Sequence, residues 1–491
     1  MNNRNSALDF VNMKDLLTSG ISDRLTLQMR MSRSLTTVAI LILAAAAPCQ
    51  VWEKLIAPGL TYRSEVDATL PRMIHALRWS PKSKVVQAVP ELAGGGVYED
   101  NPSKGRETVS AMAQRTGALA AINADFFPFT GDPLGLMVRN KELVSLPYPG
   151  RSVIAWGPGG TMTGQPIPRL TLTADGAAAL AITQLNEECK ANSITVNSDR
   201  AGIARSSTQS CVHAVIKVTG GSWLVGARVE GEVQFLMSDS AAIPIAPGNC
   251  LVTATGTMMP FVAGLRPGQR VAIDLKVDGF DWSKMDHAVG GGPGLVVGGS
   301  VAVDAEVQGF DAAFLKRHPR TAVGRTKEGD LWWVAVDGRQ KLSDGATLEE
   351  LARVMQRLGC VDAINLDGGG STALNILGVG MNRPSEGRER EVANGVVFLG
   401  PTPARDETAY VLSSPQGMVA GTTAYLRVLD PSQNPIPNAE VLWSTSGSGW
   451  IDQGGFLRAT AEGTVFVSAW VRGQVLSVGL AVQPAPPKTT Q

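Results

Sequence analysis

The most informative segment of this chain runs Gly359-Cys-Val-Asp-Ala-Ile-Asn-Leu-Asp-Gly-Gly-Gly-Ser-Thr372. Its Ile-Asn-x-Asp frame ends at Asp367, and the same frame occurs once more in the chain, where it ends at Asp125. Residues two positions apart share one face of a strand, so each copy directs an amide and a carboxylate to the same side. We therefore expect two strand ends to bring two carboxylates to one cleft.

The residues before Asp367 predict a strand, a helix and a second strand. Residues 331–336, Leu-Trp-Trp-Val-Ala-Val, are typical of a buried strand. Thr347-Leu-Glu-Glu350 matches a capping box, and Gly359 ends the apolar stripe that follows. This order forms a βαβ-like unit, and ligands commonly bind beyond the carboxyl ends of such strands. We predict an α+β catalytic domain with a mixed sheet and βαβ-like units, and a shorter helix at 107–116.

Two glycine clusters could form anion-binding turns. Gly368–Gly370 follow Asp367, and glycine allows positive φ and a close approach of the backbone to a ligand. Their N–H groups can form a nest that holds an anion, beside the hydroxyls of Ser371 and Thr372. Gly290–Gly294 could form a second nest that faces the first. The structural alternatives are a tight turn with a capping aspartate for the first cluster and a hairpin turn for the second.

A basic pair, His318 and Arg320, stands just before the strand that reaches Asp337. An arginine can hold a phosphate through two parallel hydrogen bonds. The alternatives are a surface arginine paired with a carboxylate and a structural histidine, and both are commoner for a lone residue of either type. Asp337 could contact a ligand, or it could pair with Arg339 or Arg320.

Composition limits the classes of function. The 491 residues are too many for one compact core, so two or more domains are expected. Lys and Arg number 44 and Asp and Glu also number 44, so the overall charge gives no reason to expect nucleic-acid binding. The chain contains no dinucleotide fingerprint, P-loop, zinc-protease helix motif or nucleophile elbow.

The amino-terminal residues predict export. Leu35–Ala47 is apolar, follows Arg30 and Arg33, and is followed by Pro48. This run is too short to span a bilayer comfortably, and its flanks are typical of a secretory signal. An uncleaved anchor is the alternative. We expect residues 1–48 to be a leader and the protein to be secreted, periplasmic or at the cell surface.

Four cysteines follow the leader: Cys189, Cys211, Cys250 and Cys360. None forms a C-x-x-C pair, so a zinc site is not expected. Export would allow a disulfide, either Cys189 with Cys211 or Cys211 with Cys250. Cys360 opens a predicted buried strand and is expected to be a core thiol.

Changes in composition suggest the domain boundaries. We expect a catalytic domain at 50–400, a Pro-rich linker at 401–408 and a disordered tail at 484–491. Residues 409–483 alternate strands and turns with no helical period, which favours a small β-sandwich. That segment looks like a bacterial immunoglobulin-like domain.

Several segments together resemble the phosphodiester glycosidase family. They occur in the family's order and lie within about 63–400. The matching segments are Ala121–Phe127, Gly131–Gly135, Gly290–Val296, His318–Gly324, Val336–Arg339, Ala363–Thr372 and Val392–Phe398. Ala124-Asp125 stands where some relatives have two glycines, so the resemblance supports a catalytic role more strongly for Asp367 than for Asp125.

The resemblance implies hydrolysis of the bond between a sugar anomeric carbon and a phosphodiester oxygen, with an N-acetylglucosamine-like sugar. Asp367 would then be the base or nucleophile and Asp125 a supporting group, because the oxocarbenium-like centre needs a carboxylate. His318 and Lys316 are the candidate acids. The residues expected to bind substrate are Arg320, Asn123, Asn365, Gly291, Gly292, Gly368, Gly369, Gly370, Ser371, Thr372 and Asp337.

Two other functions remain open. The first is a non-catalytic surface protein whose glycine-rich cleft binds sugar phosphates. The second is a phosphodiesterase that cuts the P–O bond and releases sugar 1-phosphate. The expected partner is a sugar phosphate or cell-envelope glycan, with attachment to the envelope through the immunoglobulin-like segment. No cofactor is expected, although a loosely bound Ca²⁺ would leave little trace in the sequence.

Overall fold

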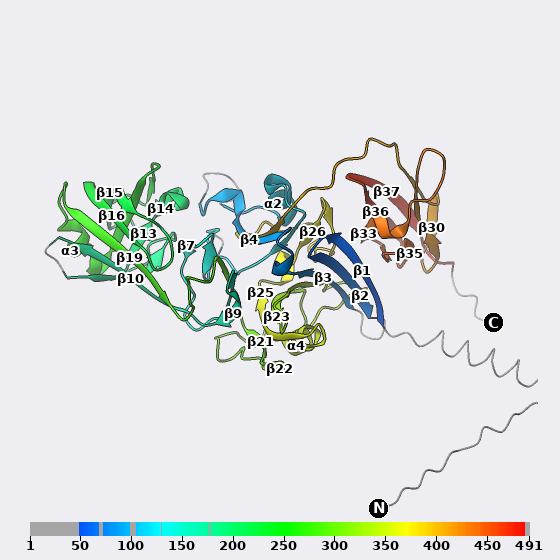
Figure 1. Cartoon of the computed structure of the whole chain (residues 1–491), viewed down its shortest axis with the longest axis horizontal. Coiled ribbons are helices and arrows are strands. Elements are labelled where there is room, and N and C mark those ends of the chain that lie inside the picture. The colour runs from blue at the N-terminus through cyan, green and yellow to red at the C-terminus, as the bar shows by residue number, and fades with distance from the viewer. Residues whose placement is uncertain (1–48, 68–71, 99–104, 129, 176–177, 487–491) are drawn as a thin grey trace, which may run out of the picture. The chain divides into compact units, whose positions relative to one another are not determined.

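The computed structural model describes residues 49–67, 72–98, 105–128, 130–175 and 178–486 (Figure 1). The predicted leader and most of the predicted tail lie outside these residues. The chain divides into two units, Met1–Gln50 and Val51–Gln491, and the fold below is that of the second. Within the described ranges, no helix has both the length and the apolar character needed to cross a membrane.

Strands dominate the described residues, with 49% in strands and 10% in helices. The α-helices there are α2 (Val109–Thr116), α3 (Met259–Ala263) and α4 (Leu348–Arg357). The prediction of an α+β fold with βαβ-like units is therefore wrong. Strands β24 (Leu331–Val336) and β25 (Cys360–Leu366) flank α4 as predicted, but β23 (Arg320–Thr326) lies between them and pairs antiparallel with both. Periodicity reveals the order of elements along the chain but not which strands pair.

The first sheet has eight strands. In the order given next, every pair of neighbouring strands from β2 onward is antiparallel. Its order is β1 (Cys49–Ala57), β2 (Leu60–Asp67), β3 (Arg72–Trp79), β24, β23, β25, β21 (Gly294–Val297) and β22 (Ser300–Val301). Helix α4 packs against β21 and β25 (Figure 1). The predicted capping box is confirmed: Thr347 accepts from the Glu350 N–H, and the Glu350 carboxylate accepts from the Thr347 N–H.

The second sheet carries the first Ile-Asn-x-Asp copy. Its order is β27 (Val379–Gly380), β26 (Leu374–Ile376), β5 (Ala120–Asn123), β28 (Asn394–Leu399) and β4 (Gln87–Leu92). Helix α2 packs on β5, as the sequence predicts for 107–116, and Thr108 caps its start. Ile122 of β5 and Ile364 of β25 belong to one buried cluster, so a shared core fixes the two motif strands relative to each other.

Two further sheets share a core of their own in the middle of the chain. The five-stranded sheet is β7 (Glu142–Ser145), β6 (Met137–Arg139), β20 (His287–Gly290), β8 (Val153–Gly157) and β9 (Gly160–Gly164). The eight-stranded sheet is β11 (Leu180–Ile182), β10 (Ile167–Ala174), β19 (Arg270–Asp278), β16 (Arg228–Ser238), β15 (Cys211–Gly221), β18 (Asn249–Thr255), β13 (Ile194–Asn197) and β12 (Gln184–Leu185). A small ribbon joins β14 (Ile203–Arg205) to β17 (Ala242–Pro244). Among the described residues of this part of the chain, α3 is the one α-helix, and it is a single short turn that was not predicted.

The carboxy-terminal strands enclose a separate cluster of buried residues between Tyr410 and Val482. They are β29 (Val411–Ser413), β30 (Gly417–Val419), β31 (Thr423–Tyr425), β32 (Arg427–Leu429), β33 (Val441–Gly447), β34 (Gly449–Ile451), β35 (Phe456–Ala459), β36 (Gly463–Val471) and β37 (Gln474–Gln483). The predicted alternation of strands and turns without an α-helix is confirmed for these residues. The immunoglobulin-like identity and the domain boundaries stay predictions.

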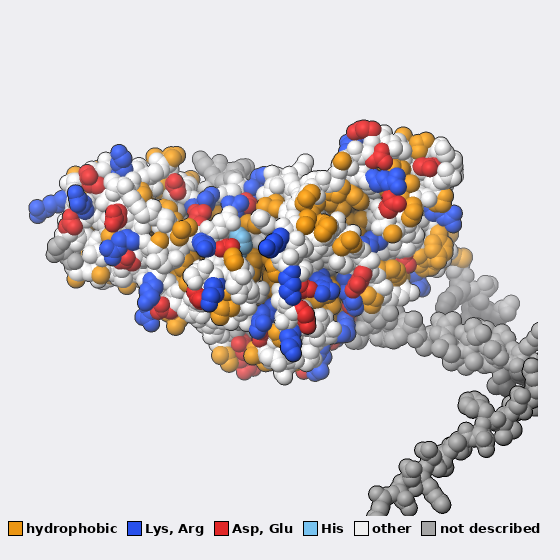
Figure 2. Space-filling view, viewed as in Figure 1, with side chains coloured by type: hydrophobic (Ala, Val, Ile, Leu, Met, Phe, Trp, Pro, Cys, Tyr) orange, Lys and Arg blue, Asp and Glu red, His pale blue; other side chains and the backbone are white. Residues whose placement is uncertain are grey.

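Cys189, Cys211, Cys250 and Cys360 are buried free thiols, so neither of the two disulfides considered above is present. Cys360 begins the buried strand β25, as predicted. Basic and acidic side chains are interspersed over the face in view (Figure 2), in keeping with the balanced composition.

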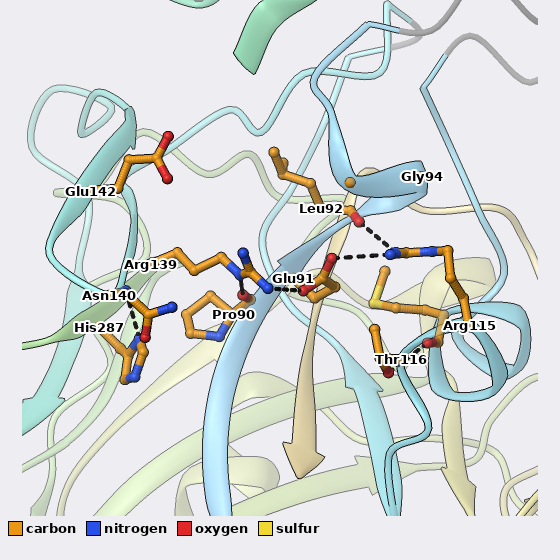
Figure 3. A network of polar contacts seen from close by, with 12 residues as sticks. Pro90, Glu91, Leu92, Gly94, Arg115, Thr116, Arg139, Asn140, Glu142 and His287 are labelled. Carbon is orange, nitrogen blue, oxygen red and sulfur yellow. Dashed lines mark hydrogen bonds and ion pairs between the residues drawn. The ribbon is translucent and has the colours of Figure 1, made fainter. Parts of the chain in front are cut away.

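A buried carboxylate, Glu91 on β4, joins α2 to β6 (Figure 3). Its Oε1 pairs with Arg115 Nη1 at 3.2 Å and its Oε2 with Arg139 Nη2 at 2.7 Å. Arg115 also donates to the Leu92 carbonyl at 2.9 Å, and Arg139 donates to the Pro90 carbonyl at 3.1 Å. One buried acid therefore pairs with two cations from different elements, although Arg115 also pairs with Glu107 at 2.9 Å.

Replacing Glu91 by Gln is expected to lower the free energy of unfolding by about 1–3 kcal/mol, because the amide can accept from one arginine only. Urea unfolding measures this change. Glu349→Gln is the control, since it removes an exposed pair with Arg353 and should change stability by less than about 0.5 kcal/mol. Equal stability of the two variants would show that the Glu91 pairs contribute little.

Candidate active site

The ends of β5 and β25 meet, and the two Ile-Asn-x-Asp copies bind each other directly. Asn123 Nδ2 donates to the Asp367 carbonyl at 2.7 Å, and the Asp367 N–H donates to the Ala124 carbonyl at 2.9 Å. Asn123 Oδ1 accepts from Thr321 Oγ1 at 2.9 Å and from the Ala373 N–H at 3.1 Å. The repeated asparagine of the first copy thus joins the two strand ends rather than pointing into solvent.

Asp125 is enclosed beside this junction, with only 3% of its surface exposed. Its Oδ1 accepts from the Phe126 N–H at 2.8 Å and its Oδ2 from the Gly135 N–H at 2.7 Å. A Cβ on Gly135 or Gly290 would stand 2.5 Å from Oδ2, so both glycines are needed to admit the carboxylate. Burial raises the pKa of Asp125 to about 7, the two N–H donors and Arg151 oppose the rise, and the nearby Asp367 adds to it.

Asp367 is the more open of the two carboxylates, since it is only partly buried. Its Oδ1 accepts from the Gly368 N–H at 2.8 Å. Burial raises its pKa to about 6, while Ser371, the Gly368 N–H and Arg390 oppose the rise. Two neighbouring carboxyls with pKa values moved towards neutrality can hold and release protons near physiological pH.

The glycine clusters shape the walls of the site, and most of their N–H groups have protein acceptors. Gly291 donates to the Ser152 carbonyl at 3.0 Å, and Gly292 donates to the Asn365 carbonyl at 2.7 Å. The Asn365 side chain returns a bond to the Gly292 carbonyl at 2.9 Å. These donors are not available to a phosphate, so we do not retain the phosphate-binding role predicted for Gly291 and Gly292.

Two N–H groups of the Gly368–Gly370 turn also donate to acceptors in the protein. The Gly368 N–H is used by Asp367, and the Gly369 N–H donates to the Pro319 carbonyl at 2.9 Å. The buried Ser371 lies close enough to favour ionised Asp367. The buried Thr372 receives a bond from Thr321 at 3.3 Å.

Arg320 directs its guanidinium to backbone carbonyls of the protein. It is 1% exposed and donates to the carbonyls of Ala346 at 3.0 Å, Phe314 at 2.6 Å and Lys316 at 2.7 Å. Burial lowers its pKa to about 10. Arg320 holds the loop before β23 in place and makes no hydrogen bond or ion pair with Asp125 or Asp367, so the phosphate-binding role predicted for it gains no support from its contacts.

Asp337 and His318 occupy different surroundings. Asp337 is buried, accepts from the Arg383 N–H at 2.9 Å and lies 3.8 Å from His75, so it pairs with neither Arg339 nor Arg320. His318 lies between Arg339 Nη2 at 3.1 Å and the Ala313 carbonyl at 3.0 Å. Lys316 is exposed, and its backbone carbonyl accepts a hydrogen bond from Arg320.

Three arginines near the carboxylates were not predicted from the sequence. Arg339 lies against Gly369, and Arg390 lies against Gly370 and acts on Asp367. Arg151 lies beside Asp125. The Val-Asp-Gly-Arg339 match was a usable signal for the first of these, whereas Arg151 only ends a Tyr-Pro-Gly-Arg turn. Among the residues described, no three His, Cys, Asp or Glu side chains lie together as a metal site would need, and the absence of a cofactor stays a prediction.

Comparison with known proteins identifies the domain that carries Asp367. Residues 213–399 match the family model described as phosphodiester glycosidase. These residues therefore form a phosphodiester glycosidase domain. Asp367 lies inside the matched segment of this phosphodiester glycosidase domain, whereas Asp125 and Arg151 precede it.

Individual relatives of the chain are distant. The SPbeta prophage-derived uncharacterized protein YomE of Bacillus subtilis (strain 168) is 32% identical over 102 residues, which is 21% of this chain and 16% of YomE. A hypothetical protein from Synechocystis has a similar fold, with a TM-score of 0.62 and 22% identity over 71% of this chain and 63% of that one. A Burkholderia pseudomallei K96243 protein, whose name describes it as exported, gives a TM-score of 0.56 and 23% identity. The match covers 67% of this chain and 74% of that one.

Proposed function

We propose that this protein hydrolyses the sugar C1–O bond of sugar-1-phosphodiesters and releases free sugar and a phosphomonoester. The observation that carries the proposal is the junction of β5 with β25, where Asp125 and Asp367 lie beside each other with raised pKa values. The match of residues 213–399 to the phosphodiester glycosidase family supports the reaction class. An N-acetylglucosamine-like sugar is the substrate that the sequence resemblance suggests.

The two carboxyls suit different tasks in this reaction. Asp367 is partly exposed and either takes a proton from the water that attacks C1 or attacks C1 itself. Asp125 is enclosed and fixed by two N–H donors, so it supports the positive charge that develops at the sugar ring. The C1–O bond breaks with its electron pair on the phosphate oxygen, and a phosphate needs little protonation to leave.

We also propose that the protein acts outside the cytoplasm, on sugar phosphates or glycans of the cell envelope. Support comes from the signal-like run Leu35–Ala47 and from the name of the Burkholderia pseudomallei protein of similar fold. The carboxy-terminal strands would then serve for attachment to the envelope.

Product analysis in ¹⁸O-labelled water tests the proposed reaction. With methyl phosphodiesters of N-acetylglucosamine, glucose and galactose, we expect free sugar that carries the label and an unlabelled methyl phosphate. Sugar 1-phosphate with the label on phosphorus would identify a phosphodiesterase instead. Absence of product from every sugar would favour the non-catalytic binding protein.

A further inference from the structure

The Arg151 side chain is a cation held by aromatic rings. Its guanidinium carbon lies 4.1 Å from the centre of the Phe310 ring, 4.7 Å from Tyr148 and 5.4 Å from Phe126. No hydrogen bond or ion pair joins the guanidinium to any described residue, and Nε is buried without an acceptor. By contrast, the Arg320 guanidinium donates to three carbonyls.

Arg151 lies next to the candidate catalytic carboxylates. It lines a narrow crevice with Asp125, Gly135, Tyr148 and Gly290. The crevice has no room for a water-sized sphere, but the Arg151 side chain is only half-buried and part of it faces solvent. Its charge favours ionised Asp125, although no Asp125 oxygen comes within ion-pair distance of it. A guanidinium whose donors have no acceptor, set beside an enclosed carboxylate, forms a place for an anion that the protein itself does not supply.

The surroundings fix the position of this cation in advance. The Gln308 side chain accepts from the Ser152 N–H at 2.9 Å and donates to Ser152 Oγ at 2.7 Å. This contact ties the residue after Arg151 to the loop that carries Phe310. Phe310 stacks on Phe314 with ring centres 4.6 Å apart, and Arg320 holds Phe314 through its carbonyl. A cation fixed in this way loses little freedom when it binds a ligand.

We infer that Arg151 is the residue that binds the phosphate of the substrate and makes the site select charged phosphodiesters over neutral glycosides. For its place in catalysis this inference rests on the proposed function, but anion binding by Arg151 does not require turnover. The planar guanidinium matches two phosphate oxygens, and the ring faces of Phe310 and Tyr148 hold its plane. Arg151 thus takes the role that the sequence suggested for Arg320.

Binding measurements on Arg151→Met test the inference, because Met keeps an apolar contact with the rings and removes the charge. The probes are inorganic phosphate and the non-hydrolysable phosphonate methyl ester of N-acetylglucosamine, titrated by calorimetry. We expect wild type to bind both and Arg151→Met to bind them at least about 10-fold more weakly. Arg151→Lys, which keeps a point charge, should fall between them.

The control is Arg228→Met on β16, which removes the same charge from an exposed pair with Asp274 and should bind as wild type does. Equal binding by Arg151→Met and wild type, or no binding of either probe by wild type, would overturn the inference. Failure of the proposed function is a different result: no product in the labelled-water experiment while Arg151-dependent binding persists.

Discussion

Asp367→Asn is expected to lower kcat/KM for a sugar-1-phosphodiester by at least about 10³-fold. The asparagine side chain has nearly the same volume, and its oxygen can still accept from the Gly368 N–H. It can neither take a proton from water nor attack C1. Steady-state rates with the methyl phosphodiester that wild type cleaves fastest measure the loss.

The matched control is Asp362→Asn in the same strand. Asp362 pairs with Arg325 and accepts from the Gly298 N–H, so it has a structural partner rather than a place beside Asp125. Its variant should keep activity within a few-fold of wild type. Comparable activity of Asp367→Asn and wild type would remove Asp367 from the reaction.

Stability provides a second readout for the same variant. Because burial raises the pKa of Asp367 to about 6, the folded protein holds a proton that the unfolded chain has already released above about pH 4. Wild-type stability should therefore fall as the pH rises from about 4 to about 6 and stay low above that. Asp367→Asn does not titrate, so relative to wild type it should gain about 1–3 kcal/mol between pH 4 and pH 8. A variant that loses both activity and stability at pH 8 would instead indicate damage to the fold.

The convergence of Asp125 with Asp367 could be anticipated because it depends on local features of the chain. A repeated Ile-Asn-x-Asp frame at two strand ends, the capping box at Thr347 and the stop at Gly359 each act over a few residues. The apolar run at 331–336 is a local feature too, and the bounds of β24 match it. The two carboxylates meet because β5 and β25 share a core. The apolar residues of both strands indicate in the sequence that the strands are buried.

Strand pairing and the partners of the arginines could not be anticipated, because both depend on distant parts of the chain. In the sheet, β23 lies between β24 and β25, so these strands form an antiparallel sheet and not the expected βαβ-like unit. No residue near α4 indicates this pairing. Arg320 and Arg151 have the same side chain, but the first donates to three carbonyls and the second lies over three aromatic rings. The family motif marks Arg320 without saying whether it touches ligand or protein.

Arg320→Met is expected to lower the free energy of unfolding by about 2–4 kcal/mol. Ala346 O keeps a bond from the His318 N–H, whereas the carbonyls of Phe314 and Lys316 each lose the donor that the structure gives them. Leaving two such carbonyls without a donor in a partly buried loop costs about 1–3 kcal/mol each, and relief of the buried charge offsets part of that. Urea unfolding gives the total change, and hydrogen exchange at 313–318 shows where the loss falls.

The same substitution separates a residue that positions the loop from one that binds phosphate. If Arg320 acts only through the loop that carries Phe310 and Phe314, Arg320→Met should weaken phosphonate binding by less than Arg151→Met does, and faster exchange at 313–318 should accompany the loss. Arg317→Met is the control, because the Arg317 side chain is exposed and pairs with Glu350 on the surface. Loss of binding with unchanged exchange and unchanged stability would place Arg320 on the ligand after all, since a guanidinium that only braces the protein cannot be removed without loosening what it braces.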